Sequence, residues 1–425
     1  MKPTLLALAL ALTASASAQN ASLKGEVTVW SWNVAAKALQ SVVPAFNKQY
    51  PGVKVNVVDL GHDAVFERGL SGCAAGGADL PDIYTLENQV AEMFWSRFPG
   101  CFTDLNTLGA DRLAKNFAAF KWTELMADGK RYAMPWDTGP VVVFYRRDLY
   151  KQAGIDPAKI QTWDDFISAG KQMNTRLGGK VKLATTGAGV DDDWFRSLAI
   201  QNGCNFFSAS GPVKVTVNQP GCVQALDVIK RMYDSGIATQ ADWNAAITQF
   251  KAGKVASFLY GGWYEGIVRT NAPDQKGLWG VYTMPAFKKG GARASNSGGS
   301  ALAIPAGSKN KAAAFAFMQF ALARPSSQVT MMKSAGLLPS SPAAARDPYV
   351  NQKQEFWGNQ AIWKTVLGTL PGIPAYRSTP YWSDAHNIMI VVMSDYVKGK
   401  YKTAQAALDD AAKKISAATG VPTAQ

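Results

Sequence analysis

Hydrophobic positions follow two different periods over the first part of the chain. Valines alternate with polar or aromatic residues over 27–30, which predicts a strand, and apolar residues recur at helical spacing over 39–50. Pro51-Gly52 ends that helix, and alternating valines over 53–57 predict a second strand. A strand–helix–strand unit normally forms a right-handed parallel crossover, so the chain opens as an α/β sheet.

The same alternation of strands and helices continues along the chain. Thr162, followed by acidic residues, predicts another helix start. Further strands are predicted at 81–86, 141–145, 213–217, 255–260 and 300–304, and further helices at 111–120 and 311–322. The fold class that this pattern predicts is α/β.

Three segments rich in proline or glycine are candidate places where the chain crosses between domains. They are residues 134–140, 288–299 and 323–325. A chain of 425 residues allows two large domains or three small ones, each with its own core.

The first eighteen residues have the features of a secretory signal peptide. A single Lys2 precedes an apolar run over 5–12, and small residues lead to Ala16-Ser17-Ala18. We expect cleavage after Ala18 and an exported, periplasmic or extracellular protein. The apolar run is shorter than the roughly 20 residues that a membrane span needs. No cysteine near the cleavage point could accept a lipid, which predicts a free protein.

The net charge of +13 would suit an anionic partner. Lysines and arginines are nevertheless scattered singly or in pairs, such as Arg146-Arg147, whereas a nucleic-acid footprint clusters them on one face. We therefore expect no nucleic-acid partner. Separately, we expect the protein to be a monomer.

Four cysteines in an exported chain predict two disulfides, for which three pairings are possible. The favoured pairing is Cys73 with Cys101 and Cys204 with Cys222, because the second pair brackets the alternating valines of 213–217. A metal site is the alternative. It is disfavoured because only two histidines, His62 and His386, are present, and neither has ligand spacing around it.

Aromatic residues stand next to carboxylates or amides directly after several predicted strands, where open α/β sheets bind ligands. An indole covers the C–H face of a pyranose ring, and planar polar groups hydrogen-bond hydroxyls. This composition predicts a sugar site. Its candidate residues are Trp32, Asn33, Glu87, Asn88, Trp136, Asp137, Gly262 and Trp263.

Each candidate has a less specific alternative. A tryptophan is often a core residue, which we expect for Trp163 and Trp194, whereas two glycines before Trp263 favour ligand contact. Glu87 and Asp137 could be a catalytic carboxylate pair, but no third group is placed to tune either pKa, so hydrogen bonding to hydroxyls is favoured. Nucleophile, Walker and Rossmann motifs are absent from the sequence, so no enzyme activity and no cofactor are predicted.

Several blocks together resemble the family 1 extracellular solute-binding proteins of ABC importers, the group with maltose-, trehalose- and lactose-binding receptors. The blocks are 46–55, 80–83, 131–166, 253–263, 297–304 and 309–322. Within this group, residues 30–36 and 94–102 are most similar to lactose or arabinose receptors. Fewer acids after the first strand and after Pro81-Asp82 depart from the maltose-type pattern and leave the exact sugar open.

The resemblance implies a two-lobed periplasmic-binding-protein fold of type II, with hinge crossings and a ligand cleft between the lobes. Lobe 1 would comprise residues 24–137 and 294–323, and lobe 2 residues 138–293 and 324–425. Sugar contacts would come from Trp32, Asn33 and Glu87 in lobe 1 and from Gly262, Trp263 and Arg377 in lobe 2, with Asp137 at the hinge and Gly299-Ser300 at the returning crossing.

These observations lead to three hypotheses. The favoured one is a carbohydrate receptor that closes like a hinge on a sugar and delivers it to the permease of an ABC importer. A secreted glycosidase or lyase is the second. The third is a receptor of the same fold for an anionic oligosaccharide, motivated by the positive charge and by Arg377.

Overall fold

The computed structural model describes residues 23–424, in two compact units. Unit 1 comprises the described residues up to Asp137 together with Gly299–Asp347, and unit 2 comprises Thr138–Gly298 and Pro348 onward. The predicted signal peptide and its cleavage site lie outside the described residues. Among residues 23–424, no helix is both long and apolar enough to cross a membrane.

Unit 1 is built on a five-stranded sheet of order β2-β1-β3-β13-β6. The first three of these strands are parallel, and β13 runs antiparallel to both of its neighbours. The strands are β1 (Gly25–Ser31), β2 (Val53–Asp59), β3 (Ile83–Glu87), β6 (Ala133–Pro135) and β13 (Ser300–Ala303), with a small hairpin of β4 (Met126–Ala127) and β5 (Lys130–Arg131). The parallel strands confirm the predicted α/β opening of the chain.

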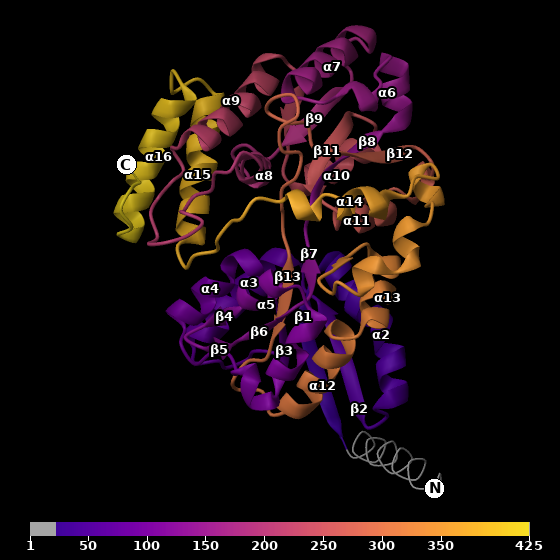
Figure 1. The fold of residues 1–425 in the computed structure, drawn as a ribbon, viewed down its shortest axis with the longest axis vertical. Helices are drawn as coiled ribbons and strands as arrows, with labels where there is room; N and C mark the ends of the chain where they lie inside the picture. The colour runs from indigo at the N-terminus through magenta and orange to yellow at the C-terminus, as the bar shows by residue number, and fades with distance from the viewer. Residues whose placement is uncertain (1–22, 425) are drawn as a thin grey trace, which may run out of the picture. The chain divides into compact units, whose positions relative to one another are not determined.

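Helices of unit 1 pack on this sheet through apolar faces. The buried side chains of α2 recur at helical spacing from Val34 to Phe46, and α2 lies against α13 and α12 (Figure 1). The helices are α2 (Asn33–Gln49), α3 (His62–Ala74), α4 (Asn88–Arg97), α5 (Ala119–Thr123), α12 (Lys311–Leu322) and α13 (Pro325–Ala335). Because α13 packs on α2, residues 324–347 belong to unit 1, which differs from the predicted lobe boundary after Ala323.

The helix predicted over 111–120 is wrong. A 3-10 helix, Ala110–Asn116, ends at Phe117, whose backbone is extended. The Phe117 ring is buried and stacks on Trp122, with ring centroids 5.2 Å apart. This packing holds the backbone out of the helical conformation and separates the 3-10 helix from α5.

Unit 2 has a second five-stranded sheet, of order β10-β9-β11-β8-β12. β9, β10 and β11 are parallel, and β8 runs antiparallel to β11 and β12. The strands are β8 (Val141–Arg146), β9 (Lys182–Thr186), β10 (Ala238–Gln240), β11 (Val255–Gly261) and β12 (Trp279–Thr283). The strand predicted over 213–217 is wrong, because only isolated bridges form there, from Val215 to Phe207 and to Thr423.

The core of unit 2 contains Trp163 and Trp194, both buried, which confirms them as core residues. Thr162 and Asp165 form a capping box at the start of α7, as predicted for a helix start here. In Figure 1, α15 and α16 lie side by side and both contact α9. The helices are α6 (Arg147–Ala153), α7 (Trp163–Arg176), α8 (Asp193–Gln201), α9 (Pro220–Asp234), α10 (Trp243–Lys251), α11 (Tyr264–Asn271), α14 (Ile362–Leu367), α15 (Trp382–Val397) and α16 (Ala404–Thr419).

Each unit contains one disulfide. Cys73 bonds Cys101 in unit 1, and Cys204 bonds Cys222 in unit 2, which confirms the predicted pairing. Both bonds join segments that are separated along the chain, and each therefore restricts the unfolded state of its own unit.

Candidate functional site

In unit 1, the carboxyl ends of β1 and β3 bring Trp32 and Glu87 to one edge of the sheet. His62, at the start of α3, lies with both: its ring meets the Trp32 ring edge-on, with centroids 5.2 Å apart, and its Nε2 is 3.4 Å from Oε2 of Glu87. The nearby Asn33 is exposed, and its backbone N–H donates to Oδ1 of Asp59 at 3.1 Å. The strand ends thus bring two predicted site residues, Trp32 and Glu87, against a histidine, and Asn33 follows Trp32 in the chain.

His62 was missed as a site residue, because the sequence analysis weighed it only as a metal ligand. The Glu87 carboxylate raises the pKa of His62 well above its ordinary value, and Asp63, whose Oδ1 is 2.9 Å from Nδ1, adds to the effect. We conclude that Glu87 faces an imidazolium, which neutralises its charge.

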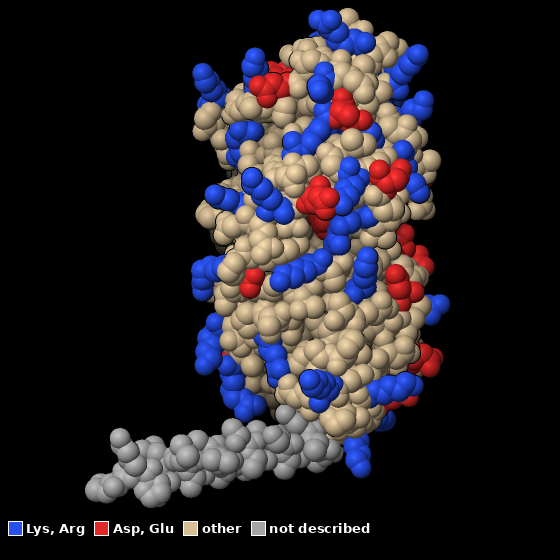
Figure 2. Space-filling view, turned by 90° about the vertical axis from the view of Figure 1, so that its right-hand side faces the viewer, with Lys and Arg blue, Asp and Glu red and all other residues tan. Residues whose placement is uncertain are grey.

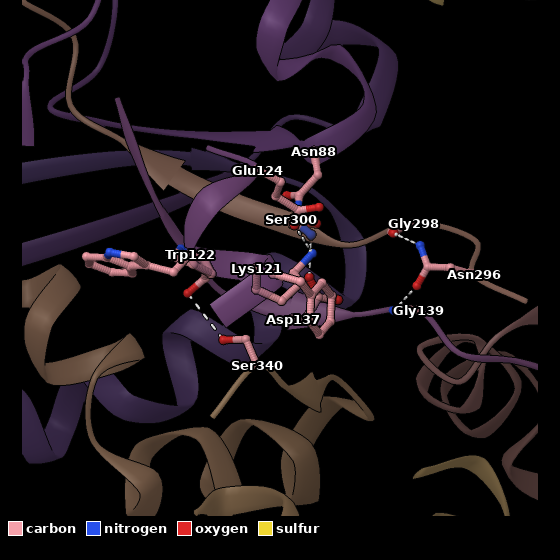
Figure 3. A network of polar contacts seen from close by, with 12 residues as sticks. Asn88, Lys121, Trp122, Glu124, Asp137, Gly139, Asn296, Gly298, Ser300 and Ser340 are labelled. Atoms are coloured by element: carbon pink, nitrogen blue, oxygen red, sulfur yellow. Dashed lines mark hydrogen bonds and ion pairs between the residues drawn. The ribbon is translucent and has the colours of Figure 1, made fainter. Parts of the chain in front are cut away.

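Asn88 follows Glu87 and belongs to a buried polar network (Figure 3). Its Nδ2 donates to Oε1 of Glu124, and the same Oε1 is ion-paired with Nζ of Lys121. The backbone N–H of Asn88 donates to the Gly299 carbonyl at 2.9 Å. Asn88 Oδ1 is buried without a hydrogen-bond partner. Lys121 and Glu124 were missed, since nothing in the sequence distinguishes them from surface charges.

Asp137 lies in the same network, at the point where the chain leaves unit 1. Its Oδ1 accepts a hydrogen bond from the backbone N–H of Ser300 at 2.5 Å. Burial raises the pKa of Asp137 to about 6, although the Ser300 hydrogen bond and Lys121 act in the opposite direction. Asp137, Gly299 and Ser300, three predicted site residues, are therefore brought together.

Trp136 is a core residue and not the ligand contact that was predicted. Its side chain is 1% exposed, so the structure leaves no ring surface for a sugar. Its backbone N–H donates to the Ser300 carbonyl at 3.0 Å, within the sheet of unit 1. The residue belongs to the core, as large aromatic side chains often do.

In unit 2, Trp263 follows β11 and is half-buried. Its Nε1 donates to the carbonyl of Ser297 at 2.9 Å, and its ring stacks on Trp243, with centroids 6.0 Å apart and planes at 28°. The backbone N–H of Gly262 donates to the Pro140 carbonyl at 3.0 Å. These contacts fix the indole before any ligand arrives. Trp243 was not predicted as a site residue, because no sequence feature next to it indicates that it stacks on Trp263.

Steric crowding explains why the residue before Gly262, Gly261, is a glycine. A Cβ at Gly261 would lie 2.5 Å from the Ser297 carbonyl oxygen and 2.5 Å from Nε1 of Trp263. Only glycine allows the backbone to approach so closely. The two glycines before Trp263 predicted close approach to a ligand, but at Gly261 the close approach is to Ser297 and to the Trp263 ring of the protein itself.

Arg377, a predicted contact of the second lobe, is engaged with the protein itself. Its Nη1 donates to the Gly211 carbonyl at 2.8 Å, and its own carbonyl accepts from Asn205 at 3.4 Å. The guanidinium thus holds a loop of unit 2, and this engagement competes with a role as an anion ligand.

A polar cluster that the sequence analysis missed follows β9 in unit 2. The buried Asp192 is ion-paired with Arg196 at 2.7 Å and with His386 at 3.0 Å, and the His386 ring stacks on Trp382, with centroids 4.6 Å apart. Burial disfavours the Asp192 carboxylate, but Arg196 and His386 outweigh it and lower its pKa.

No group of three or more metal-ligating side chains occurs within the described part of the chain. Unit 2 has a cavity of about 480 Å³ between α7, α9 and the start of α16. Its lining includes the Asp164–Arg231 ion pair and Lys402, and none of the predicted site residues.

Solved binding proteins of ABC transporters share this fold. The ABC transporter associated binding protein from B. animalis subsp. lactis Bl-04, in complex with β-1,6-galactobiose, has a TM-score of 0.82 at 22% sequence identity, covering 95% of this chain and 100% of that chain. The GacH receptor of Streptomyces glaucescens GLA.O, solved unliganded and with acarbose, has a TM-score of 0.79 at 24% identity, covering 92% and 98%. The predicted type II fold is confirmed.

The family model for bacterial extracellular solute-binding proteins matches residues 30–326, and the chain belongs to that family. The lactose-binding protein of Rhizobium radiobacter is 28% identical over 388 residues, which cover 89% of this chain and 90% of the relative. The arabinooligosaccharide-binding protein of Bacillus subtilis strain 168 is 26% identical over 424 residues, covering 97% and 96%. The family resemblance predicted from the sequence is confirmed.

Proposed function

We propose that this chain is an exported carbohydrate receptor that binds a sugar or oligosaccharide and delivers it to the permease of an ABC importer. The observation that carries the proposal is the half-buried Trp263, whose indole is held by the Ser297 carbonyl and by Trp243. A ring fixed in advance loses little conformational entropy when it covers a sugar face. Relatives that bind lactose and arabino-oligosaccharides support the same ligand class.

The unit 1 residues would supply hydrogen bonds to sugar hydroxyls. Trp32 and Glu87 lie beside His62, and Asn33 is exposed next to them. Carboxylates and amides accept or donate in planar pairs that suit neighbouring hydroxyls. This proposal includes the site residues named above and export by cleavage after Ala18. It also includes a free monomeric state and hinge closure at the crossings.

Binding is favoured over glycoside hydrolysis by the surroundings of the two carboxylates. Hydrolysis needs one carboxylic acid and one carboxylate on either side of the scissile bond. Glu87 faces His62, and Asp137 is 2% exposed with one oxygen bonded to the Ser300 backbone. A turnover assay on the sugar that binds is expected to release no product, and product formation would favour the enzyme.

An anionic oligosaccharide is disfavoured by the engaged Arg377. Figure 2 shows lysines and arginines spread over one face among carboxylates, not gathered into one patch. Affinity is therefore expected to change little with ionic strength. A steep fall with added salt would support the anionic ligand instead.

The test of the proposed function is a thermal-shift screen of the mature protein against lactose, arabino-oligosaccharides, galactobiose and malto-oligosaccharides. A ligand at 100 times its dissociation constant adds about 2.7 kcal/mol of stability, so the correct sugar should raise the melting temperature clearly. A cooperative melt that no sugar shifts would contradict the proposal. A fall in the radius of gyration on adding that sugar would support hinge closure.

A further inference from the structure

The buried network of unit 1 contains a lysine, which is unusual for an interior position. Lys121 is 1% exposed, and its ammonium is ion-paired with Glu124. Glu124 in turn accepts from the side-chain amide of Asn88. In Figure 3, these three side chains gather beside Asp137 and Ser300. A charge that is removed from water in this way must be matched by nearby opposite charges.

The network lies where the chain passes from one unit to the other. Asp137 is the last residue of unit 1 before the first crossing, and Gly299 is the first residue after the return. Within unit 1, Asp137 Oδ1 accepts from Ser300 N–H at 2.5 Å, and Asn88 N–H donates to the Gly299 carbonyl at 2.9 Å. The outgoing and returning segments are thus joined by the same group of residues.

Unit 2 joins the same two segments with a neutral side chain. Asn296 Oδ1 accepts from Gly139 N–H at 3.1 Å, and its Nδ2 donates to the Gly298 carbonyl at 2.7 Å (Figure 3). The charged connection therefore lies on the unit 1 side, where the candidate sugar contact Glu87 ends β3 and Asn88 begins α4.

Gly299 makes room for the lysine. Its φ of +110° disfavours any residue with a side chain, and a Cβ there would lie 3.0 Å from Nζ of Lys121 and 3.4 Å from the Asp137 carbonyl oxygen. Glycine at this position thus allows the positive φ of the backbone and also leaves space for the Lys121 ammonium.

We propose that Lys121 is a positioning residue for the sugar site. Its buried ammonium holds Glu124, and through Glu124 the amide of Asn88, against the crossing segments at Asp137 and Gly299. Without it, the half-buried Glu124 would lose its cation and the buried Asp137 would lose a favourable charge, so Asn88 would no longer be held in place through Glu124. This inference rests on the proposed function, because it concerns the geometry of the same site.

A purely stabilising role does not explain the charges, because a buried ion pair is often no more stable than apolar residues of similar size. The charges that face Asp137 also give the proposal a specific signature. Lys121 lowers the pKa of Asp137, and Glu87, itself paired with His62, raises it. Removing Lys121 should therefore raise the pKa of Asp137 further.

The experiment compares the wild type with Lys121→Met and with the double variant Lys121→Met/Glu124→Met. Lys115→Met is the matched control, because Lys115 is an exposed lysine in the preceding 3-10 helix. Melting temperature and affinity for the sugar found in the thermal-shift screen are measured between about pH 5 and pH 8, a range that brackets the pKa of Asp137, about 6.

Lys121→Met should weaken sugar binding by about tenfold or more near neutral pH, as expected when one partner of a buried charge pair is removed. The wild-type affinity should fall as the pH drops through about 6, where Asp137 takes up its proton, and the variant should show this fall at a higher pH. The double variant should regain much of the melting temperature but not the affinity.

Wild-type affinity and an unchanged pH profile in the folded double variant would overturn the positioning role, since a well-packed apolar pair would then suffice. If Lys121→Met does not fold, the double variant decides the question. A wild type that binds no sugar would contradict the proposed function as well, whereas equal binding by the wild type and all variants would contradict this inference alone.

Discussion

The candidate residues of the two units are held in place by different forces. In unit 1, Glu87 and Asn88 are surrounded by charged groups, His62, Lys121 and Glu124. In unit 2, Trp263 is held by an aromatic stack and by one backbone carbonyl. The first arrangement depends on protonation states and the second does not, so the two units should respond differently to pH and to substitution.

The largest expected effect is on the aromatic side of this comparison. Replacing Trp263 by alanine removes the ring that would cover the sugar and should abolish binding, a loss of about 4 kcal/mol or roughly 1,000-fold in affinity. Isothermal titration calorimetry measures it. Phe120→Ala, which removes an exposed ring of unit 1, is the control for altered surface hydrophobicity. Normal affinity in a folded Trp263→Ala protein would contradict the site assignment.

Each unit can be weakened separately through its disulfide. The bonds close loops of 28 and 18 residues, and removing either one by double substitution to alanine should cost about 3 kcal/mol. Hydrogen exchange followed by mass spectrometry should show faster exchange in unit 1 without Cys73–Cys101, and in unit 2 without Cys204–Cys222. Equal acceleration in both units after either change would show that they unfold together.

The charged side of the comparison predicts a pH dependence of stability. The pKa of Asp137 is about 6 in the folded protein, above its ordinary value of 3.8, so the folded state binds a proton more tightly than the unfolded state between these values. The free energy of unfolding that this proton contributes is fully present below about pH 4 and is lost as the pH rises through about 6, by roughly 3 kcal/mol.

Asp137→Asn keeps an acceptor for the Ser300 N–H and removes this titration. Urea unfolding of both proteins at several pH values measures the difference between their stabilities. The variant should lack the fall between about pH 4 and pH 6, which the wild type retains. Parallel curves for the two proteins would contradict the assignment.

The smallest expected effect lies away from both sets of candidate residues. Thr162 Oγ1 accepts from the N–H of Asp165 at 3.2 Å, and Thr162→Ala should cost about 1 kcal/mol of stability by removing the cap of α7. Sugar affinity should not change. Thr175→Ala, at an exposed position within the same helix, is the matched control in chemical denaturation. A loss of affinity with Thr162→Ala would mean that α7 contributes to the site.

The sequence by itself determined those features that contiguous residues encode. Alternating valines predicted β1 and β2, and both strands are present. The disulfide pairing was predicted because Cys204 and Cys222 bracket the alternating valines of 213–217, and the pairing is present although those residues form no strand. The two strands depend on near neighbours along the chain, and tertiary packing did not override them.

Only the tertiary structure decided which polar residues are buried together. Asp137 and Ser300 are 163 positions apart, and a lysine such as Lys121 is normally exposed, so no local pattern marks them as partners. The same reason explains why Trp136 proved to be a core residue and why Arg377 holds a loop. Contacts between distant segments are set by how the sheets and helices pack, and a hydrophobic period contains no information about them.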